Sequence, residues 1–171
     1  MTLALLLLRL VVGLSFVGHG AQKLFGWFGG GGPSRTSAGF ASIGFKAPLA
    51  MAIMAGLGEF AGGWLLAAGL FTPLATFAIC SVMIVAIVSS HLQNGYWGYR
   101  GGYELNLAYA AVALAAVLAG PGAWSLDRAI GWDHRLRGLG VTAIVVCAAG
   151  LSGFATLFYL RERSTESEGL P

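Results

Sequence analysis

Apolar residues fill five stretches of this sequence, and polar or glycine-rich breaks separate them. The five stretches cover residues 3–24, 48–71, 73–92, 104–119 and 139–160. About 20 predominantly apolar residues are enough for an α-helix to cross a bilayer. The pattern predicts an all-α integral membrane helical bundle of five spans, with its two termini on opposite faces of the membrane.

The composition supports a membrane protein and excludes a soluble domain. The chain is 57% hydrophobic and 10% charged, and its mean hydropathy is +0.76. Soluble domains carry about 25% charged residues. The net charge is only +3, and Lys and Arg occur singly rather than in a basic run. We therefore expect a lipid bilayer around the chain and no nucleic-acid partner, with the basic residues acting as orientation charges beside the membrane.

The breaks between the stretches differ in character. Residues 25–47 begin with FGWFGGGGPSR, which predicts a flexible glycine turn rather than a phosphate loop. Residues 93–103 are rich in Trp and Tyr, which favour the lipid–water interface. Thr72 followed by Pro73 predicts a tight junction in which Thr72 caps the third helix. Residues 161–171 are polar and predict a short solvated tail.

Six ionisable residues lie inside the spans or at their ends, where charge is costly and commonly functional. They are Arg9, His19, Lys23, Glu59, His91 and Glu104. His19 and Lys23 are four residues apart and share a helix face. His91 ends the third span and Glu104 begins the fourth, on the same side of the membrane as Lys23. Groups from three spans are thus expected at one depth, beneath the aromatic residues of 93–103.

Glu59 is the one acidic residue near the middle of a span, within the sequence GLGEFAGG. A carboxylate at that depth needs a partner, and the small residues around it let a second helix approach closely. We expect His19 or Lys23 of the first span as its basic partner, with Arg9 as the alternative. Arg9 and Glu59 are also candidates for a purely structural polar cluster.

The cysteines and histidines give no sign of a metal site. Cys80 and Cys147 lie in separate apolar stretches without ligand spacing, so both are expected to be reduced core residues. His19 and His91 lie one per span, which argues against haem or a bound metal ion.

The sequence resembles the DoxX family of small bacterial membrane proteins. The matching segments are LLLLRLVVGLSFVGHGAQKLFG at 5–26, GEFAGGWLLAAGLFTPLA at 58–75, the region of His91, GGYELNLAYAAVAL at 101–114 and GPGAWSLDRAIG at 120–131. Their order and spacing make the resemblance specific over about residues 5–131. The recurring polar positions of the family fall on the six ionisable residues named above.

The resemblance implies a four-helix membrane unit in the bacterial plasma membrane, here residues 1–138, to which residues 139–160 add a further span. Relatives in that family include a subunit of an archaeal thiosulfate:quinone oxidoreductase. Another is described as the membrane part of an oxidative-stress complex with superoxide dismutase and a sulfurtransferase. Four-span members have both ends in the cytoplasm, so a fifth span would place the tail outside. Basic residues are in excess on the side of the membrane that holds residues 25–47, residues 93–103 and the tail. This excess favours the opposite orientation, with the tail in the cytoplasm, and both orientations stay open.

Two functions from different classes are consistent with these features. The first is a subunit of a membrane-bound redox system, quinone-linked or concerned with oxidative stress, with or without an activity of its own. His19, Lys23, His91, Trp97 and Tyr103 would then bind a quinone or another lipophilic ligand, with Tyr99 beside them. Glu59 and Glu104 would relay protons as the candidate catalytic residues. The second is a non-enzymatic scaffold or assembly factor that anchors a partner protein. Partner redox proteins and a second copy of the chain are the further partners considered.

Overall fold

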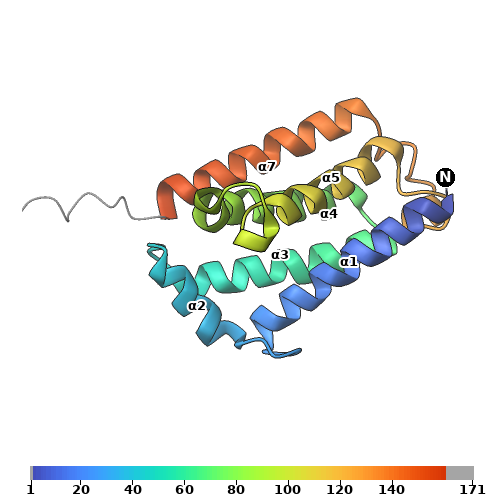
Figure 1. The fold of residues 1–171 in the computed structure, drawn as a ribbon. Helices are drawn as coiled ribbons and strands as arrows, with labels where there is room; N and C mark the ends of the chain where they lie inside the picture. The colour runs from blue at the N-terminus through green and yellow to red at the C-terminus, as the bar shows by residue number, and fades with distance from the viewer. Residues whose placement is uncertain (1, 161–171) are drawn as a thin grey trace, which may run out of the picture.

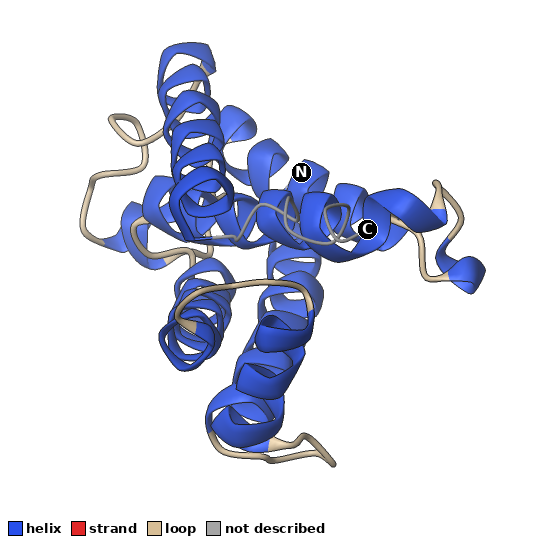
Figure 2. Ribbon diagram, turned by 90° about the vertical axis from the view of Figure 1, so that its left-hand side faces the viewer, coloured by secondary structure: helices blue, strands red, loops and turns tan. Residues whose placement is uncertain are grey.

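The protein is a bundle of helices, and its computed structural model describes residues 2–160 (Figure 1). Five long helices form the bundle: α1 (Thr2–Leu24), α3 (Pro48–Ala68), α4 (Thr72–Ala86), α5 (Glu104–Ala119) and α7 (Leu139–Leu160). Two shorter helices, α2 (Gly32–Ser42) and α6 (Leu126–Ala129), lie in the connections. Figure 2 shows helices and loops throughout this part of the chain, without a strand. The prediction of an all-α membrane bundle is confirmed.

In the described part of the chain, four helical segments are long and apolar enough to cross a membrane. They are Leu3–Leu24, Pro48–Ala68, Thr72–Asn94 and Leu139–Phe158. The third continues from α4 through a π-helical turn and a 3-10 turn. Helix α5 is apolar but has 16 residues, about 24 Å, less than the roughly 30 Å of a bilayer core. The fourth of the five predicted spans, residues 104–119, thus stays a prediction. The solvated tail predicted for 161–171 lies outside the described residues.

Glycines allow α1 and α3 to cross with their backbones in contact. A Cβ atom on Gly20 would lie 2.4 Å from the backbone nitrogen of Phe60. A Cβ atom on Gly63 would lie 2.6 Å from the carbonyl oxygen of Gly13. On the opposite side of α3, Gly62 faces α4, where its Cβ would lie 3.1 Å from that of Ala78. The small residues around Glu59 therefore admit a second helix, as the sequence predicts, and they do so on both sides of α3.

The turn between α3 and α4 is held from a distant part of the chain. Asp127, on α6, is fully buried and accepts hydrogen bonds from the backbone nitrogens of Phe71 (2.8 Å) and Thr72 (3.0 Å). It also accepts one from the Thr72 hydroxyl at 2.6 Å. The prediction that Thr72 caps α4 is wrong, because Phe71 is the N-cap residue and no side-chain cap bond forms there. The carboxylate of Asp127 instead satisfies the free N–H groups at the positive end of the helix.

The connection 25–47 contains a helix as well as a turn. The glycine run turns as predicted, with positive φ at Gly29 (77°) and Gly32 (62°). The chain then forms α2, which packs against α3 and α1. The prediction of a loop is therefore wrong for Gly32–Ser42. Helix α2 lies across the end of the bundle, beside the last turns of α1 (Figure 1).

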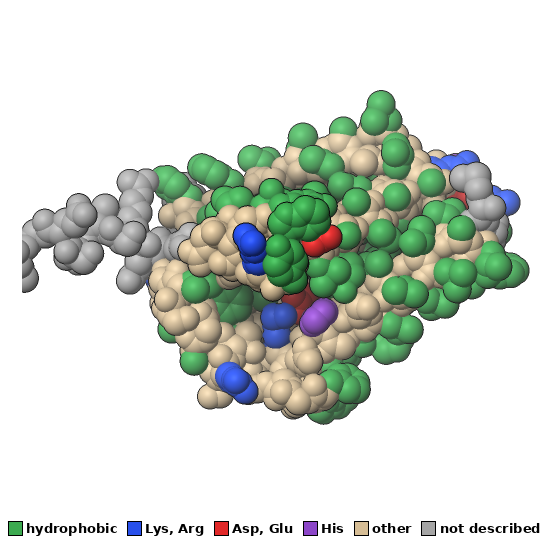
Figure 3. Space-filling view, in the orientation of Figure 1, with side chains coloured by type: hydrophobic (Ala, Val, Ile, Leu, Met, Phe, Trp, Pro, Cys, Tyr) green, Lys and Arg blue, Asp and Glu red, His purple; other side chains and the backbone are tan. Residues whose placement is uncertain are grey.

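The core lies where α1, α3, α4 and α5 meet. Its buried members include Phe16, Leu66, Ile79 and Ala113. Large apolar side chains cover much of the outer surface, as Figure 3 shows, which suits contact with lipid.

Both cysteines are free thiols, but only one belongs to the core. Cys80 is buried, whereas Cys147 is exposed on the surface of the bundle. The prediction that Cys147 is a core residue is wrong. Helix α7 packs mainly against α4, and residues on its other face lie on the outside.

Candidate functional site

A cavity of about 1090 Å³ opens among the helices at the end of the bundle that carries α2. Helices α1 to α5, the loop before α5 and the last turns of α7 all line it. Five of the six ionisable residues that the sequence singles out lie in its wall: His19, Lys23, Glu59, His91 and Glu104. Figure 3 shows charged and histidine side chains gathered around a hollow on this face. The residues that the sequence predicts to lie together thus line one cavity.

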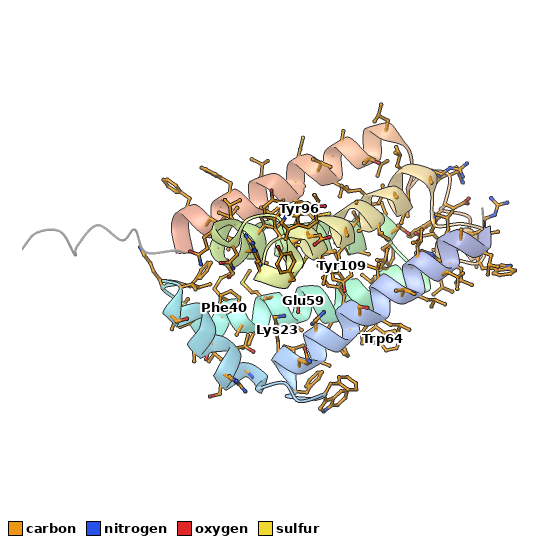
Figure 4. The ribbon with its side chains drawn as sticks, in the orientation of Figure 1. Lys23, Phe40, Glu59, Trp64, Tyr96 and Tyr109 are labelled. Atoms are coloured by element: carbon orange, nitrogen blue, oxygen red, sulfur yellow. The ribbon has the colours of Figure 1, made fainter. Side chains whose placement is uncertain are left out.

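The first polar group of the cavity, which we name the α1–α3 pole, consists of His19, Lys23 and Glu59. Lys23 Nζ lies 2.5 Å from Glu59 Oε2, and the two residues face each other between α1 and α3 in Figure 4. The side chain of Glu59 is 5% exposed and that of Lys23 is 27% exposed. His19 lies one turn before Lys23 and is exposed. The expectation that Glu59 is buried beside a basic residue of the first span is confirmed, and Lys23 is that residue.

The second polar group, the α4–α5 pole, consists of His91 and Glu104. His91 ends the π-helical turn Ile87–His91, a local widening of the helix that often occurs at functional sites. Its Nδ1 lies 2.7 Å from the carbonyl oxygen of Gly101. Glu104 begins α5, and its Oε2 accepts a hydrogen bond from the backbone nitrogen of Gly98 at 2.9 Å. Both side chains are thereby held by the loop that joins the two helices.

The wall between the poles is mainly apolar and aromatic. Phe16 and Tyr109 meet edge to face, with ring centroids 5.2 Å apart. Helix α2 adds Phe40 to the wall, and α4 adds Ser81, whose hydroxyl has no hydrogen-bond partner among residues 2–160.

Sequence reasoning missed these wall residues, for two reasons. It did not predict a helix at 32–42, so it could not predict that Phe40 lies in the wall of the cavity. Hydroxyl residues such as Ser81 are also common in membrane helices and carry no signal of their own. The same holds for Ser152 and Thr156, through which α7 reaches the cavity.

The aromatic residues of 93–103 do not reach the cavity in the way that the sequence suggests. Trp97 is 54% exposed and Tyr99 is 78% exposed. Tyr103 packs edge to face on Tyr96. None of the rings of Trp97, Tyr99 and Tyr103 lines the cavity, whereas the backbone of Gly98, Gly101 and Gly102 does. The loop therefore contributes main chain to the site.

Arg9 lies far from this cavity. It is 14 residues before Lys23 on α1, about 21 Å along the helix. Its side chain is 1% exposed, and Nη2 donates a hydrogen bond to the carbonyl oxygen of Trp124 at 2.7 Å. Asp127 attracts its charge. The structure does not bring Arg9 and Glu59 together, and Arg9 instead holds the connection between α5 and α7 against α1.

The arrangement suits an amphipathic organic molecule more than a metal ion. Within residues 2–160 no group of three or more His, Cys, Asp or Glu side chains is placed to hold a metal. Ligand pockets are typically apolar with a few polar groups that fix orientation. This cavity has that character. Its wall is mainly apolar, and the α1–α3 pole and the α4–α5 pole are its two polar groups.

Comparison with known proteins agrees with the fold and with the sequence. The DoxX family model matches residues 4–92, and the chain belongs to the DoxX family. An uncharacterized membrane protein of Mycobacterium tuberculosis is 33% identical over 131 residues, which cover 71% of this chain and 77% of that protein. The inner membrane protein YphA of Escherichia coli is 32% identical over 133 residues, 72% of this chain and 88% of that protein. No solved structure matches the chain. The protein is therefore a membrane protein of a bacterial family.

Proposed function

We propose that this protein is a subunit of a membrane-bound redox system and binds a quinone-type lipophilic carrier in its cavity. The observation that carries the proposal is the cavity itself, with an apolar wall and a polar group at each of two poles. Its volume of about 1090 Å³ is slightly above the usual range for small-molecule sites, roughly 300–1000 Å³, so it has room for a drug-sized ligand. A ring with oxygens on opposite sides and an apolar tail matches this distribution.

Each pole has a role in this proposal. Lys23 donates one N–H to Glu59 and has further N–H groups for a ligand oxygen. His19, at the exposed edge, lies where a ligand enters. Glu59 and Glu104 are the groups that exchange protons with the ligand. The aromatic side chains of Phe16 and Tyr109 pack against its ring.

The proposal extends to location and partners. One relative is named an inner membrane protein and another a membrane protein. We therefore place this chain in the bacterial plasma membrane. A soluble or membrane-bound redox protein would exchange electrons with the carrier.

Extraction of the purified protein tests the proposal. The protein is isolated from bacterial membranes in mild detergent, and quinones in a solvent extract are quantified against the protein. Ala55→Phe fills the cavity from α3, and Ala61→Phe adds the same group on the outer face of α3. We expect about one quinone per chain for the wild type and for Ala61→Phe, and a large loss for Ala55→Phe. Equal quinone in all three, or none in the wild type, would refute the proposal.

A scaffold function is the second candidate, and one observation favours it. The polar groups of the cavity already have structural partners: Lys23 pairs with Glu59, and His91 and Glu104 bind the loop. Such contacts fix the register of the helices without any ligand. In that case the extract contains no quinone above the background of the detergent, while a partner protein still co-purifies with Ala55→Phe.

A further inference from the structure

The two poles of the cavity offer a ligand different hydrogen-bonding groups. The α1–α3 pole is rich in donors. The Lys23 ammonium has three N–H groups and no acceptor, and it gives one of them to Glu59 at 2.5 Å. A ligand oxygen that contacts the Lys23 ammonium must therefore accept a hydrogen bond.

The α4–α5 pole offers acceptors. His91 Nδ1 lies 2.7 Å from the carbonyl oxygen of Gly101, and a carbonyl oxygen can only accept. Nδ1 therefore carries the proton, and Nε2 of the neutral ring is left as an acceptor. The structure gives Nε2 no hydrogen-bond partner within residues 2–160.

Glu104 adds a second acceptor at the same pole. Its Oε2 accepts from the backbone nitrogen of Gly98 at 2.9 Å. Oε1 has no partner among the described side chains and backbone groups, and an ionised carboxylate has no proton to give. His91 and Glu104 thus each offer a free acceptor to whatever occupies this end of the cavity.

From this asymmetry we infer that the cavity binds the hydroxyl-bearing, reduced form of its carrier in preference to the quinone. The inference rests on the proposed function. A hydroxyl group both donates and accepts, so a hydroquinone can accept from Lys23 and donate to His91 or Glu104. The oxygens of a quinone only accept, so a quinone leaves the α4–α5 pole unpaired. The hydroxyls of Ser81 and Tyr109 can donate or accept, so they serve both forms equally.

Equilibrium binding to the full-length protein in nanodiscs tests the inference. The probes are decyl-benzoquinone and decyl-hydroquinone, measured without oxygen at about pH 8, where imidazole in water is neutral. A redox-inert pair, 4-decylphenol and its methyl ether, isolates the hydroxyl proton from redox chemistry. We expect the hydroxyl member of each pair to bind about tenfold more tightly, because it alone can donate a hydrogen bond to the acceptors of the α4–α5 pole.

Two variants make the test specific to the α4–α5 pole. In Glu104→Gln the amide oxygen is retained by the N–H of Gly98, so the NH₂ group replaces Oε1 and a donor replaces an acceptor. The preference should then disappear or reverse. His91→Asn keeps an N–H for the carbonyl of Gly101 but removes the Nε2 acceptor, and it should weaken the preference. Ala61→Phe, on the outer face of α3, should leave the affinity ratio within each of the two probe pairs unchanged.

The outcomes separate this inference from the proposed function. If neither the quinone nor the hydroquinone binds, the proposed function fails and the inference fails with it. If both bind equally, or the quinone binds more tightly, a carrier site exists but the inference is wrong. An unchanged preference in both Glu104→Gln and His91→Asn would also overturn it, because the α4–α5 pole would then not be its source.

Discussion

The ion pair between Lys23 and Glu59 connects the fold to the cavity, and a double-mutant cycle measures it. The three variants are Lys23→Met, Glu59→Gln and the two changes together. Each single change removes one charge and leaves the other between α1 and α3. The double variant removes both and leaves an uncharged contact of similar size.

The geometry gives the magnitude of the coupling. The separation of Nζ and Oε2 is 2.5 Å, which corresponds to an attraction of about 7 kcal/mol at an effective dielectric constant of about 20. Desolvation of both groups opposes this, so we expect a net coupling of about 2–3 kcal/mol. Lys23→Met should lower the free energy of unfolding by about 1 kcal/mol more than Glu59→Gln does. The reason is that Glu59 is buried, whereas a stranded Lys23 can extend towards water from its partly exposed position.

Unfolding in mixed micelles of a mild detergent and sodium dodecyl sulfate gives the free energy of unfolding for the wild type and the three variants. We expect the double variant to lose less free energy of unfolding than the two single variants lose when their losses are added. Additive effects within about 0.5 kcal/mol would show that the pair is not coupled and would refute the reasoning. A larger loss for Glu59→Gln than for Lys23→Met would contradict the burial argument.

Three further changes test other parts of the fold. Asp127→Asn should lower the free energy of unfolding by about 2–3 kcal/mol, because at least one of its three donors loses its acceptor; the same micelle titration measures this. Gly20→Ala should force α1 away from α3 and lower the melting temperature by several degrees, whereas Gly18→Ala, with no atom within 4 Å of its Cβ, should not. Cys147 should react with a membrane-permeant maleimide while buried Cys80 stays unmodified, as mass analysis of the intact protein would show. Equal labelling of the two thiols would contradict the packing of α4.

The features that the sequence predicts well depend on distance along a helix. Apolar stretches of about 20 residues define the long helices to within a few residues. The position of a residue along its stretch also gives its depth in the membrane. For this reason the sequence could place His19, Lys23, His91 and Glu104 close together. The pairing of Glu59 with the first span was predictable because a lone carboxylate at that depth requires a cation nearby.

The features that the sequence predicts poorly depend on contacts between segments that lie far apart in the chain. Nothing near Thr72 shows that Asp127, 55 residues later, accepts its N–H group. The composition of 93–103 indicates an interface, but glycines turn its backbone inward and leave Trp97 on the outside. The burial of Arg9 against the α5–α7 connection likewise depends on a contact across 115 residues.

Photoaffinity labelling in native membranes is a direct test of quinone binding in the cavity. A quinone analogue with a diazirine on its ring is activated by light, and the labelled peptides are mapped by mass spectrometry. If the carrier binds in the cavity, labels appear on cavity residues such as Met51, Met54, Ser81 and Tyr109, and these labels are lost when unlabelled carrier is added. Labels confined to outward-facing residues such as Ile144 and Leu151, unaffected by competitor, would show that the carrier is only dissolved in the surrounding lipid and would contradict the account.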